Sequence, residues 1–380
     1  IKAEDMMTSI TNAQQALQGK TSGVQVISSS GSPGADMKIR IRGYSSNGKS
    51  DPLYIVDGLR AESISSLDPN NIASMEVLKD AASAAIYGAE GGNGVVLITT
   101  KTGMQSTTKV TYDFQYSIQS PTHLPKLMNA EQYIGYQTEA GNLPQNTTSI
   151  YDTDWLEEVF ESSPMQKHNL SVSGSNDKST YYASLGYLNH NGIVVGNQDK
   201  YQRISGMFNG SYKIKSWLKV GSNLSLGYSK RSSISENNIE NSVVGNALVL
   251  DPLTPTEYIG TLPDNITDLL NNNKKLLQSG NNNYYGISDY VTGNINPLVR
   301  LASSQNKYVQ NSVMGNIYAD ITPINGFTIT SKIGFNYDNG ILSGYNPGYY
   351  YNASNYNEYP GVSEATSTTH YWQWDNYVSY

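Results

Sequence analysis

The stretch SMEVLKDAASAAIYGAEGGNGVVLITTKTG, residues 74–103, decides the fold of the first part of the chain. Within it, MEVLKD predicts a strand, AASAAIYG predicts a short helix that ends at Gly88, and GVVLITTK predicts a second strand. Working outward, a short helix is expected at residues 11–18, and strands are expected at VQVIS, MKIRIRG and LYIVDG, residues 24–28, 37–43 and 53–58. These elements predict a small mixed α/β unit over residues 1–104.

The segment GAEGGNG, residues 88–94, has the glycine content of a phosphate-binding loop. No Lys-Ser or Lys-Thr pair follows it, and the next element is a strand where a phosphate-binding loop would open a helix. We therefore interpret the glycines as a tight backbone turn and do not predict nucleotide binding.

From Thr107 onward the pattern changes to long strands with strict alternation. Val110, Phe114 and Ile118 fall on one face with Tyr112 and Tyr116, while polar residues fall on the other. Segments of about ten residues or more suit strands that cross a membrane at a tilt. About eight such strands are predicted, near residues 108–119, 166–174, 179–189, 200–214, 217–231, 307–322, 326–340 and 369–380.

The connections between these strands alternate in length. SNDKS, KIKSW and PINGF predict tight turns, whereas residues 120–164, 189–199, 232–306 and 342–368 form longer polar connections. Short turns at one end and long loops at the other are typical of an outer-membrane barrel. A soluble β-sandwich or β-helix enzyme is the alternative, although soluble strands average only about five to six residues.

Composition excludes several classes of protein. The 25 Lys and Arg against 32 Asp and Glu give a net charge of −7, which argues against a nucleic-acid binder. The absence of cysteine excludes disulfides and thiolate metal sites, and the four histidines are too scattered to predict a zinc site. No cofactor is expected. No apolar run reaches the roughly 18 residues of a membrane-spanning helix.

Several segments carry a family resemblance. ALQGKTSGVQV, IRIRGYSS, DPLYIVDGL and the 74–103 stretch strongly resemble the plug domain of TonB-dependent outer-membrane transporters, specifically the SusC-like branch from Bacteroidetes. TDWLEEVFESSPMQKHNLSVSGSNDKSTYYASLGYLNHNGIV looks like the first barrel strands and first extracellular loop of that branch. The resemblance covers about residues 10–230, and the later residues match only in barrel character.

The resemblance implies a fold and a location. We expect a TonB-dependent receptor plug domain at residues 1–104, then the N-terminal part of an antiparallel transmembrane β-barrel at 105–380, about eight of an expected 22 or so strands. The chain is accordingly interpreted as a fragment, with the TonB-binding segment before Ile1 and about 14 strands after Tyr380. The expected location is the cell outer membrane of a Gram-negative, Bacteroidetes-like organism.

The resemblance also implies a function. We expect TonB-dependent import of a large nutrient, a glycan or a peptide, with a SusD-like surface lipoprotein as a lid, and no enzymatic activity. TonB, the nutrient and outer-membrane lipid are the expected partners. The alternatives are an outer-membrane receptor or signalling protein that binds its ligand without importing it, and a soluble glycan-processing β protein.

Two arginines are candidates for fastening the plug to the barrel. Arg40 and Arg42 alternate with Ile39 and Ile41, so they project from the opposite face of their strand. In the resembling family the arginine of this segment locks plug to barrel, which assigns that role to Arg42. Its acidic partner is expected on a strand beyond Tyr380.

Loops dense in tyrosine and asparagine are candidates for facing the substrate. Aromatic faces stack on sugar rings and amides bond to hydroxyls, although the same residues suit a peptide equally. The candidates are Tyr44, Ser45, Ser46 and Asn47 in the plug, and Tyr284 and Tyr285 in a long connection.

Overall fold

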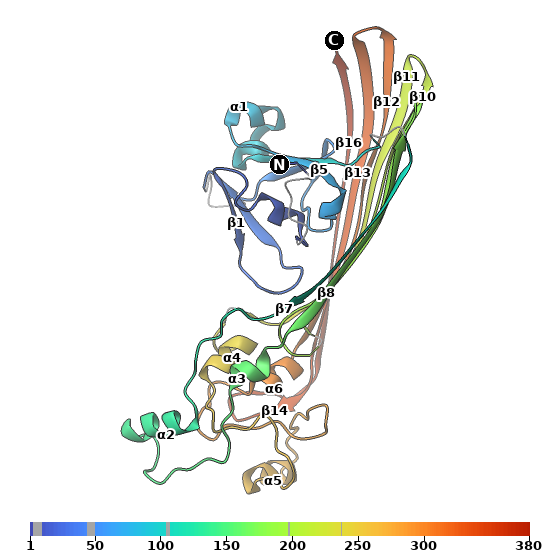
Figure 1. The fold of residues 1–380 in the computed structure, drawn as a ribbon. Helices are drawn as coiled ribbons and strands as arrows, with labels where there is room; N and C mark the ends of the chain where they lie inside the picture. Colours follow the sequence, from blue (N-terminus) through green and yellow to red (C-terminus); the bar gives the residue numbers. More distant parts are fainter. Residues whose placement is uncertain (3–9, 44–49, 104–106, 197, 237) are drawn as a thin grey trace.

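Eight long strands form one antiparallel sheet in the described part of the chain (Figure 1). The computed structural model describes all residues except 3–9, 44–49, 104–106, 197 and 237. Each strand pairs with its neighbour in the chain, apart from the short pair β14 and β15, so the order across the sheet is β16-β13-β12-β11-β10-β9-β8-β7. The strands are β7 (Lys109–Gln119), β8 (Ser163–Ser175), β9 (Ser179–Asn191), β10 (Lys200–Lys215), β11 (Leu218–Ser233), β12 (Gln305–Ile324), β13 (Phe327–Asn346) and β16 (Gly361–Ser379).

The alternation read from the sequence assigns the two faces of this sheet correctly. On β7, Val110 and Ile118 are 67% and 66% exposed, and apolar side chains continue outward across the sheet with Phe208 and Ile333. This apolar face is turned away from the rest of the molecule, as the lipid-facing side of a membrane barrel requires. Between them, residues such as Arg203 project inward and are buried.

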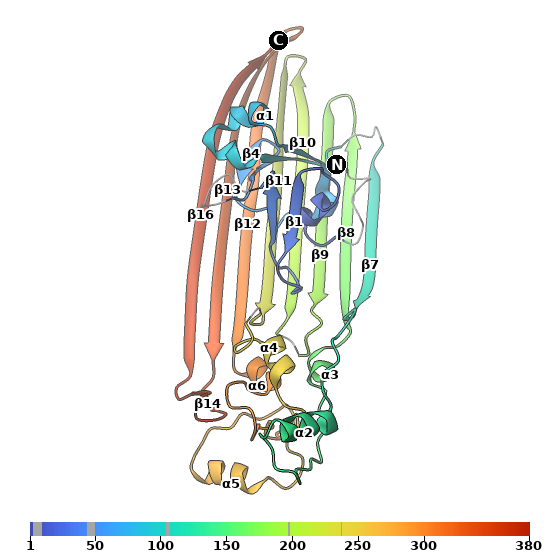
Figure 2. The ribbon, with the colours of Figure 1, turned by 90° about the vertical axis from the view of Figure 1, so that its left-hand side faces the viewer.

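The α/β unit lies on the inner, concave side of the sheet (Figures 1 and 2). It holds a four-stranded sheet of order β4-β3-β6-β5, in which β3 and β6 run parallel, and a separate antiparallel pair, β1 and β2. Its elements are η2 (Ala13–Leu17), β1 (Val24–Ser28), β2 (Met37–Ile41), β3 (Leu53–Val56), β4 (Leu59–Ala61), η3 (Pro69–Asn71), β5 (Ile72–Leu78), α1 (Ala81–Ala84), η4 (Ala85–Asn93) and β6 (Val95–Thr100).

One hydrophobic core serves the α/β unit and extends into the large sheet. Ile39, Ile72 and Val96 are fully buried in it, and Tyr182 of β9 and Met207 of β10 belong to the same cluster. Burial of apolar area stabilises by roughly 25 cal/mol per Å², so this shared core holds the unit against the sheet.

The glycine-rich segment forms the tight turn that its sequence predicts. Gly88, at φ 63°, interrupts the helical residues between α1 and β6, and Gly94 has φ 88°. A Cβ on Gly94 would stand 2.7 Å from Cδ1 of Ile41, so a side chain there would displace β2. The glycines therefore allow a close approach of two backbone segments.

The connections of the large sheet differ in length at its two ends, with short turns at one end and long connections at the other. Tight turns join β8 to β9, β10 to β11 and β12 to β13 at one end, and the longer connections gather at the other (Figure 2). The elements of these connections are α2 (Ala130–Glu139), α3 (Trp155–Val159), α4 (Val243–Val249), α5 (Asp264–Asn271), α6 (Pro297–Ala302), β14 (Tyr349–Tyr350) and β15 (Tyr356–Asn357). Among the described residues, no helix combines the length and the apolar character needed to cross a membrane.

Candidate functional site at the interface between plug and barrel wall

A buried arginine on the wall of the large sheet fastens the α/β unit, hereafter the plug. Arg203 lies on β10 at an inward position, and its side chain is 1% exposed. Its Nη2 stands 3.7 Å from Oδ2 of Asp68, which is 3% exposed. Its Nη1 donates to the carbonyl oxygens of Thr11 and Ser65, at 3.0 and 3.3 Å. One guanidinium thus joins two separate plug segments, at Thr11 and at residues 65–68, to the wall.

The segment around Asp68 is shaped to meet the wall. Asp68 caps the short helix η3, because its Oδ1 accepts the backbone N–H of Asn70 at 2.9 Å. Its other oxygen, Oδ2, accepts the hydroxyl of Ser205 at 3.2 Å and faces Arg203. Asn71 follows, and its Oδ1 accepts the hydroxyl of Tyr182 at 2.9 Å. A helix cap therefore also serves as an attachment point.

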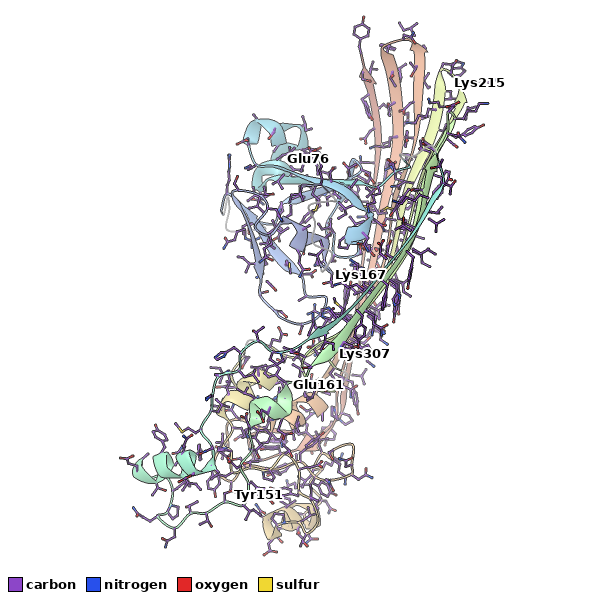
Figure 3. The ribbon with its side chains drawn as sticks, viewed as in Figure 1. Glu76, Tyr151, Glu161, Lys167, Lys215 and Lys307 are labelled. Atoms are coloured by element: carbon purple, nitrogen blue, oxygen red, sulfur yellow. The ribbon has the colours of Figure 1, made fainter. Side chains whose placement is uncertain are left out.

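Lysine and amide groups extend this interface. Figure 3 shows Lys167 of β8 between the plug and the sheet, and its Nζ donates to the carbonyl of Ile10 and to Oδ1 of Asn70, both at 3.3 Å. Asn209 of β10 donates to Oγ1 of Thr100 and to the carbonyl of Lys101, both at 2.7 Å. The wall therefore supplies the hydrogen-bond donors of these contacts, and many of the acceptors that the plug supplies are backbone carbonyls.

The other half of the sheet holds the plug at the turn between β3 and β4. Asp57 and Gly58 both have positive φ, as expected of an Asp-Gly hairpin turn. The carbonyl of Asp57 accepts the Nζ of Lys332 on β13 at 3.1 Å, and that of Gly58 accepts the amide of Gln373 on β16 at 2.9 Å. The Asp57 carboxyl accepts from Thr100, and burial raises its pKa.

Both arginines that the sequence indicates as locks are engaged within the plug. Arg40 Nη1 lies 2.8 Å from Oδ1 of Asp51, and Arg42 Nη2 lies 2.6 Å from Oδ1 of Asp80. The Arg42 pair is open to solvent, with side chains 56% and 62% exposed. In the described residues the polarity of the attachment is thus reversed, since the cations stand on the wall and the carboxylate on the plug. An acidic partner of Arg42 beyond Tyr380 remains a prediction.

The substrate-facing candidates divide into two groups. Tyr44, Ser45, Ser46 and Asn47 lie outside the described residues. Tyr285 packs partly against Ile295, Val299 and Tyr351, and it also lines a cavity of about 410 Å³ together with Glu158 and Glu257. The carbonyl of Tyr284 accepts the backbone N–H of Tyr258 at 2.8 Å. Contact of either tyrosine with a substrate remains a prediction.

The long connections are packed into a unit of their own, the loop lobe, formed by the described residues of 120–162, 234–304 and 347–360. Its core joins Trp155, Leu156 and Val159 of α3 to Val243 and Leu250 of the next long connection. The indole Nε1 of Trp155 donates to the carbonyl of Asp251 at 2.8 Å. The carboxyl of Asp251, itself fully buried, accepts the hydroxyls of Thr254 and Ser288. The lobe is therefore an ordered body at the end of the sheet.

The plug reaches the lobe side through the loop between β1 and β2. Ser32 in this loop donates to a carboxylate oxygen of Glu236. Nearby, the pKa of Asp199 is raised to about 6. Burial is the main cause, the charge of Glu236 acts in the same direction, and a hydrogen bond from Ser32 opposes the shift. Gly34 has φ +66°, and a Cβ there would lie 2.3 Å from the ring of Tyr201 on β10. This loop fits tightly against both wall and lobe.

Sequence reasoning missed the wall residues that hold the plug. A signal was present, because Arg203, Ser205 and Asn209 repeat polar groups on the inward face of β10. Such a row indicates a polar neighbour, but it does not say which of the plug's segments comes opposite. That pairing depends on contacts between residues far apart in the chain.

Comparison with known proteins agrees with this architecture. The family model described as TonB-dependent Receptor Plug Domain matches residues 1–95. TonB-dependent receptor P26 of Formosa agariphila is 29% identical over all of this chain, which spans 37% of that protein. TonB-dependent receptor SusC of Bacteroides thetaiotaomicron is 30% identical over 84% of this chain, and the match spans 33% of SusC. The chain therefore spans about a third of the length of these curated relatives.

A solved structure shares the whole fold. The RagAB peptide importer in its open-open state superimposes with a TM-score of 0.78 and 26% identity, covering 100% of this chain and 44% of the importer chain. The match therefore includes both the plug and the long strands. The chain belongs to the SusC-like TonB-dependent receptors of the Gram-negative outer membrane, and it carries their plug followed by antiparallel strands of their barrel.

Proposed function

We propose that the full-length protein imports a large nutrient, a glycan or a peptide, across the outer membrane in a TonB-dependent manner. One observation carries the proposal: most of the polar contacts that hold the plug inside the curved wall are hydrogen bonds that wall side chains donate, and many of their acceptors are plug backbone carbonyls. Both partners of such bonds can exchange to water when the plug shifts, and each bond contributes only about 0.5–1.5 kcal/mol net. The interface is thus stable at rest and can be opened by an external pull.

The relatives support the direction of this proposal. RagAB is described as a peptide importer, and SusC as a TonB-dependent receptor. We further propose that residues 1–104 act as the plug and residues 105–380 as barrel wall. TonB would pull through a segment outside this chain, and no enzymatic step is required.

The loop lobe is proposed as the seat of a SusD-like lipoprotein lid. Parity assigns it to the cell surface if the first strand, β7, runs outward from the plug. The lobe is ordered by its own core around Trp155 and Asp251, so it presents a fixed shape on which a lid can close. The same parity assigns the tight turns to the periplasm.

Uptake in living cells tests the proposal. Cells with the intact gene, cells lacking it and cells de-energised with a protonophore are compared for accumulation of labelled glycan and peptide mixtures. We expect gene-dependent uptake that stops on de-energisation. Surface binding that depends on the gene without any uptake would favour a receptor that signals, and would refute import.

A further inference from the structure

A cavity between the loop lobe and the end of the large sheet carries a positive charge, and none of its described lining residues is acidic. It has a volume of about 410 Å³, within the range of roughly 300–1,000 Å³ usual for ligand pockets. Arg300 of α6 is the sole charged residue among its described lining residues. The others include the amides of Gln198, Asn241, Asn306, Asn346 and Asn357, the hydroxyls of Ser235, Ser303 and Ser304, and Tyr349.

Arg300 is held in place but not saturated. Helix α6 begins at its cap residue Asn296, whose Oδ1 accepts the N–H of Leu298 at 2.9 Å. The Nη2 of Arg300 donates to the carbonyl of Glu240 at 3.3 Å, and its guanidinium interacts with Tyr349. Its Nε is buried without a hydrogen-bond partner, and no acidic side chain of the described residues forms an ion pair with it.

A second unsatisfied group belongs to Gln198, which lines both this cavity and the neighbouring cavity that contains Glu158 and Glu257. Oε1 of Gln198 is buried without a partner in the described structure. An unpaired buried donor or acceptor costs about 1–3 kcal/mol, so a ligand that satisfies both groups gains affinity. The Arg300 guanidinium can donate to an anionic acceptor, and the Gln198 oxygen can accept from a hydrogen-bond donor. A bare anion offers only the first of these.

Two residues that line the cavity lie on the inward face of the large sheet. Asn346 shares the inward face of β13 with Lys332, whose ammonium contacts the plug, and Asn306 lies at an inward position of β12. Figure 2 places α4 and α6 directly beyond the ends of β11 and β12. A ligand in the cavity would therefore lie between the loop lobe and the space that the plug occupies.

Neighbouring cavities have the opposite electrostatic character. The cavity lined by Tyr285 contains Glu158 and Glu257, and the cavity at the plug loop contains Asp199 and Glu236. An anionic ligand is repelled by both and accepted at Arg300.

We propose that the Arg300 cavity binds an acidic sugar residue, one that carries a carboxylate or a sulfate, on the imported substrate. The planar guanidinium fork matches either anion, and sugar hydroxyls supply the donors and acceptors that the amides and Gln198 require. The dense amide and hydroxyl lining favours a glycan over a peptide. This inference rests on the proposed import function and narrows its substrate class.

Calorimetric titration of the purified full-length protein in detergent tests the assignment. The probes are tetragalacturonate, its methyl ester, a sulfated galactose tetramer and a tetrapeptide with a free carboxyl terminus. We expect Arg300→Gln to weaken binding of an acidic tetramer roughly ten- to hundredfold, the range of a charge-assisted hydrogen bond. The methyl ester should bind the unaltered protein about as weakly as tetragalacturonate binds Arg300→Gln.

A matched control and a second variant keep the test sharp. Lys307→Gln removes a positive charge next to Asn306 but on the outward face of β12, where the side chain is exposed (Figure 3), so it should leave binding unchanged. If Arg300→Gln fails to fold, Asn346→Asp places a carboxylate in the cavity wall and should also weaken acidic probes, with the methyl ester unaffected.

Three results would overturn the assignment. These are unchanged binding in the folded cavity variants, no binding of any acidic tetramer by the unaltered protein, or Arg300-dependent binding of the tetrapeptide in place of the sugars. Uptake assays separate this inference from the import proposal. Energy-dependent uptake without Arg300-dependent binding refutes the cavity assignment alone, and binding without gene-dependent uptake refutes import alone.

Discussion

Removal of the Arg203 guanidinium should release the plug from the wall. Arg203 and Asp68 are 1% and 3% exposed, and at 3.7 Å their attraction is about 4–5 kcal/mol for an effective dielectric constant of about 20. Arg203→Met keeps much of the side-chain volume but leaves Asp68 buried with the hydroxyl of Ser205 as its remaining wall partner. Breaking a buried pair from one side costs about 3–5 kcal/mol. We expect the free energy of plug unfolding to fall by that amount.

The double variant Arg203→Met, Asp68→Asn provides the internal control. It removes both charges, so no uncompensated carboxylate remains in the interface, and we expect it to recover most of the stability lost in the single variant. A double-mutant cycle that includes Asp68→Asn isolates the coupling between the two groups.

Two assays on the full-length protein report on plug seating. Limited proteolysis in detergent measures how readily the plug opens, and growth on vancomycin reports whether intact cells admit a large solute through a loosened plug. Arg203→Met should raise both proteolysis and vancomycin sensitivity, and the double variant should return toward the unaltered protein. The reasoning is refuted if Arg203→Met matches the unaltered protein in both assays, or if the double variant loses as much as the two single variants combined.

Other expectations follow from the loop between β1 and β2 and from the two ends of the sheet. Burial raises the pKa of Asp199 to about 6, so the folded state binds this proton more tightly than the unfolded state does. Stability should therefore fall as pH rises from about 4 through 6. The melting temperature of Asp199→Asn should depend less on pH over this range. Gly34→Ala should destabilise by about 2–4 kcal/mol through its positive φ and its ring contact, whereas Gly19→Ala, also at positive φ but with nothing within 4 Å, should cost only about 1–2 kcal/mol in denaturant titrations. Single cysteines at Asn281 and Asn325 should label from outside intact cells at Asn281 only, and the reverse pattern would invert the topology.

The strand order was predictable because the sequence alternates strictly and the turns are short. Antiparallel neighbours joined by turns such as PINGF must pair next to each other, which sets the order of β12 and β13 without further information. The ends of the long strands were harder to predict from the sequence. The strand expected at 369–380 in fact begins at Gly361, because pairing with β13 extends it through the polar run SEATSTT, which carries no apolar alternation.

The structure of the plug was equally predictable where it depends on the backbone preferences of single residues. The Asp57-Gly58 turn and the break at Gly88 follow from backbone preferences of single residues. The attachment to the wall does not follow from such rules. Arg203 and Asp68 are separated in the chain by the last third of the plug and three long strands, and only the folded arrangement brings them together.

The reversed polarity of this attachment has a physical consequence for opening. A cation fixed on a plug must be dragged with it, and its partner on the wall is then left as a bare carboxylate. Here the cations of Arg203, Lys167 and Lys332 stay on the rigid sheet, and apart from Asp68 the moving side gives up carbonyl and amide acceptors that water can satisfy. In the described residues, Asp68 at the cap of η3 is the plug carboxylate within ion-pair distance of a wall cation, so its charge must be rehydrated when the plug leaves the wall, and the short helix at that point is itself easily unwound. An opening movement that begins by freeing this cap would break the buried ion pair first and leave exchangeable hydrogen bonds, and the apolar contacts of Tyr182 and Met207, to follow.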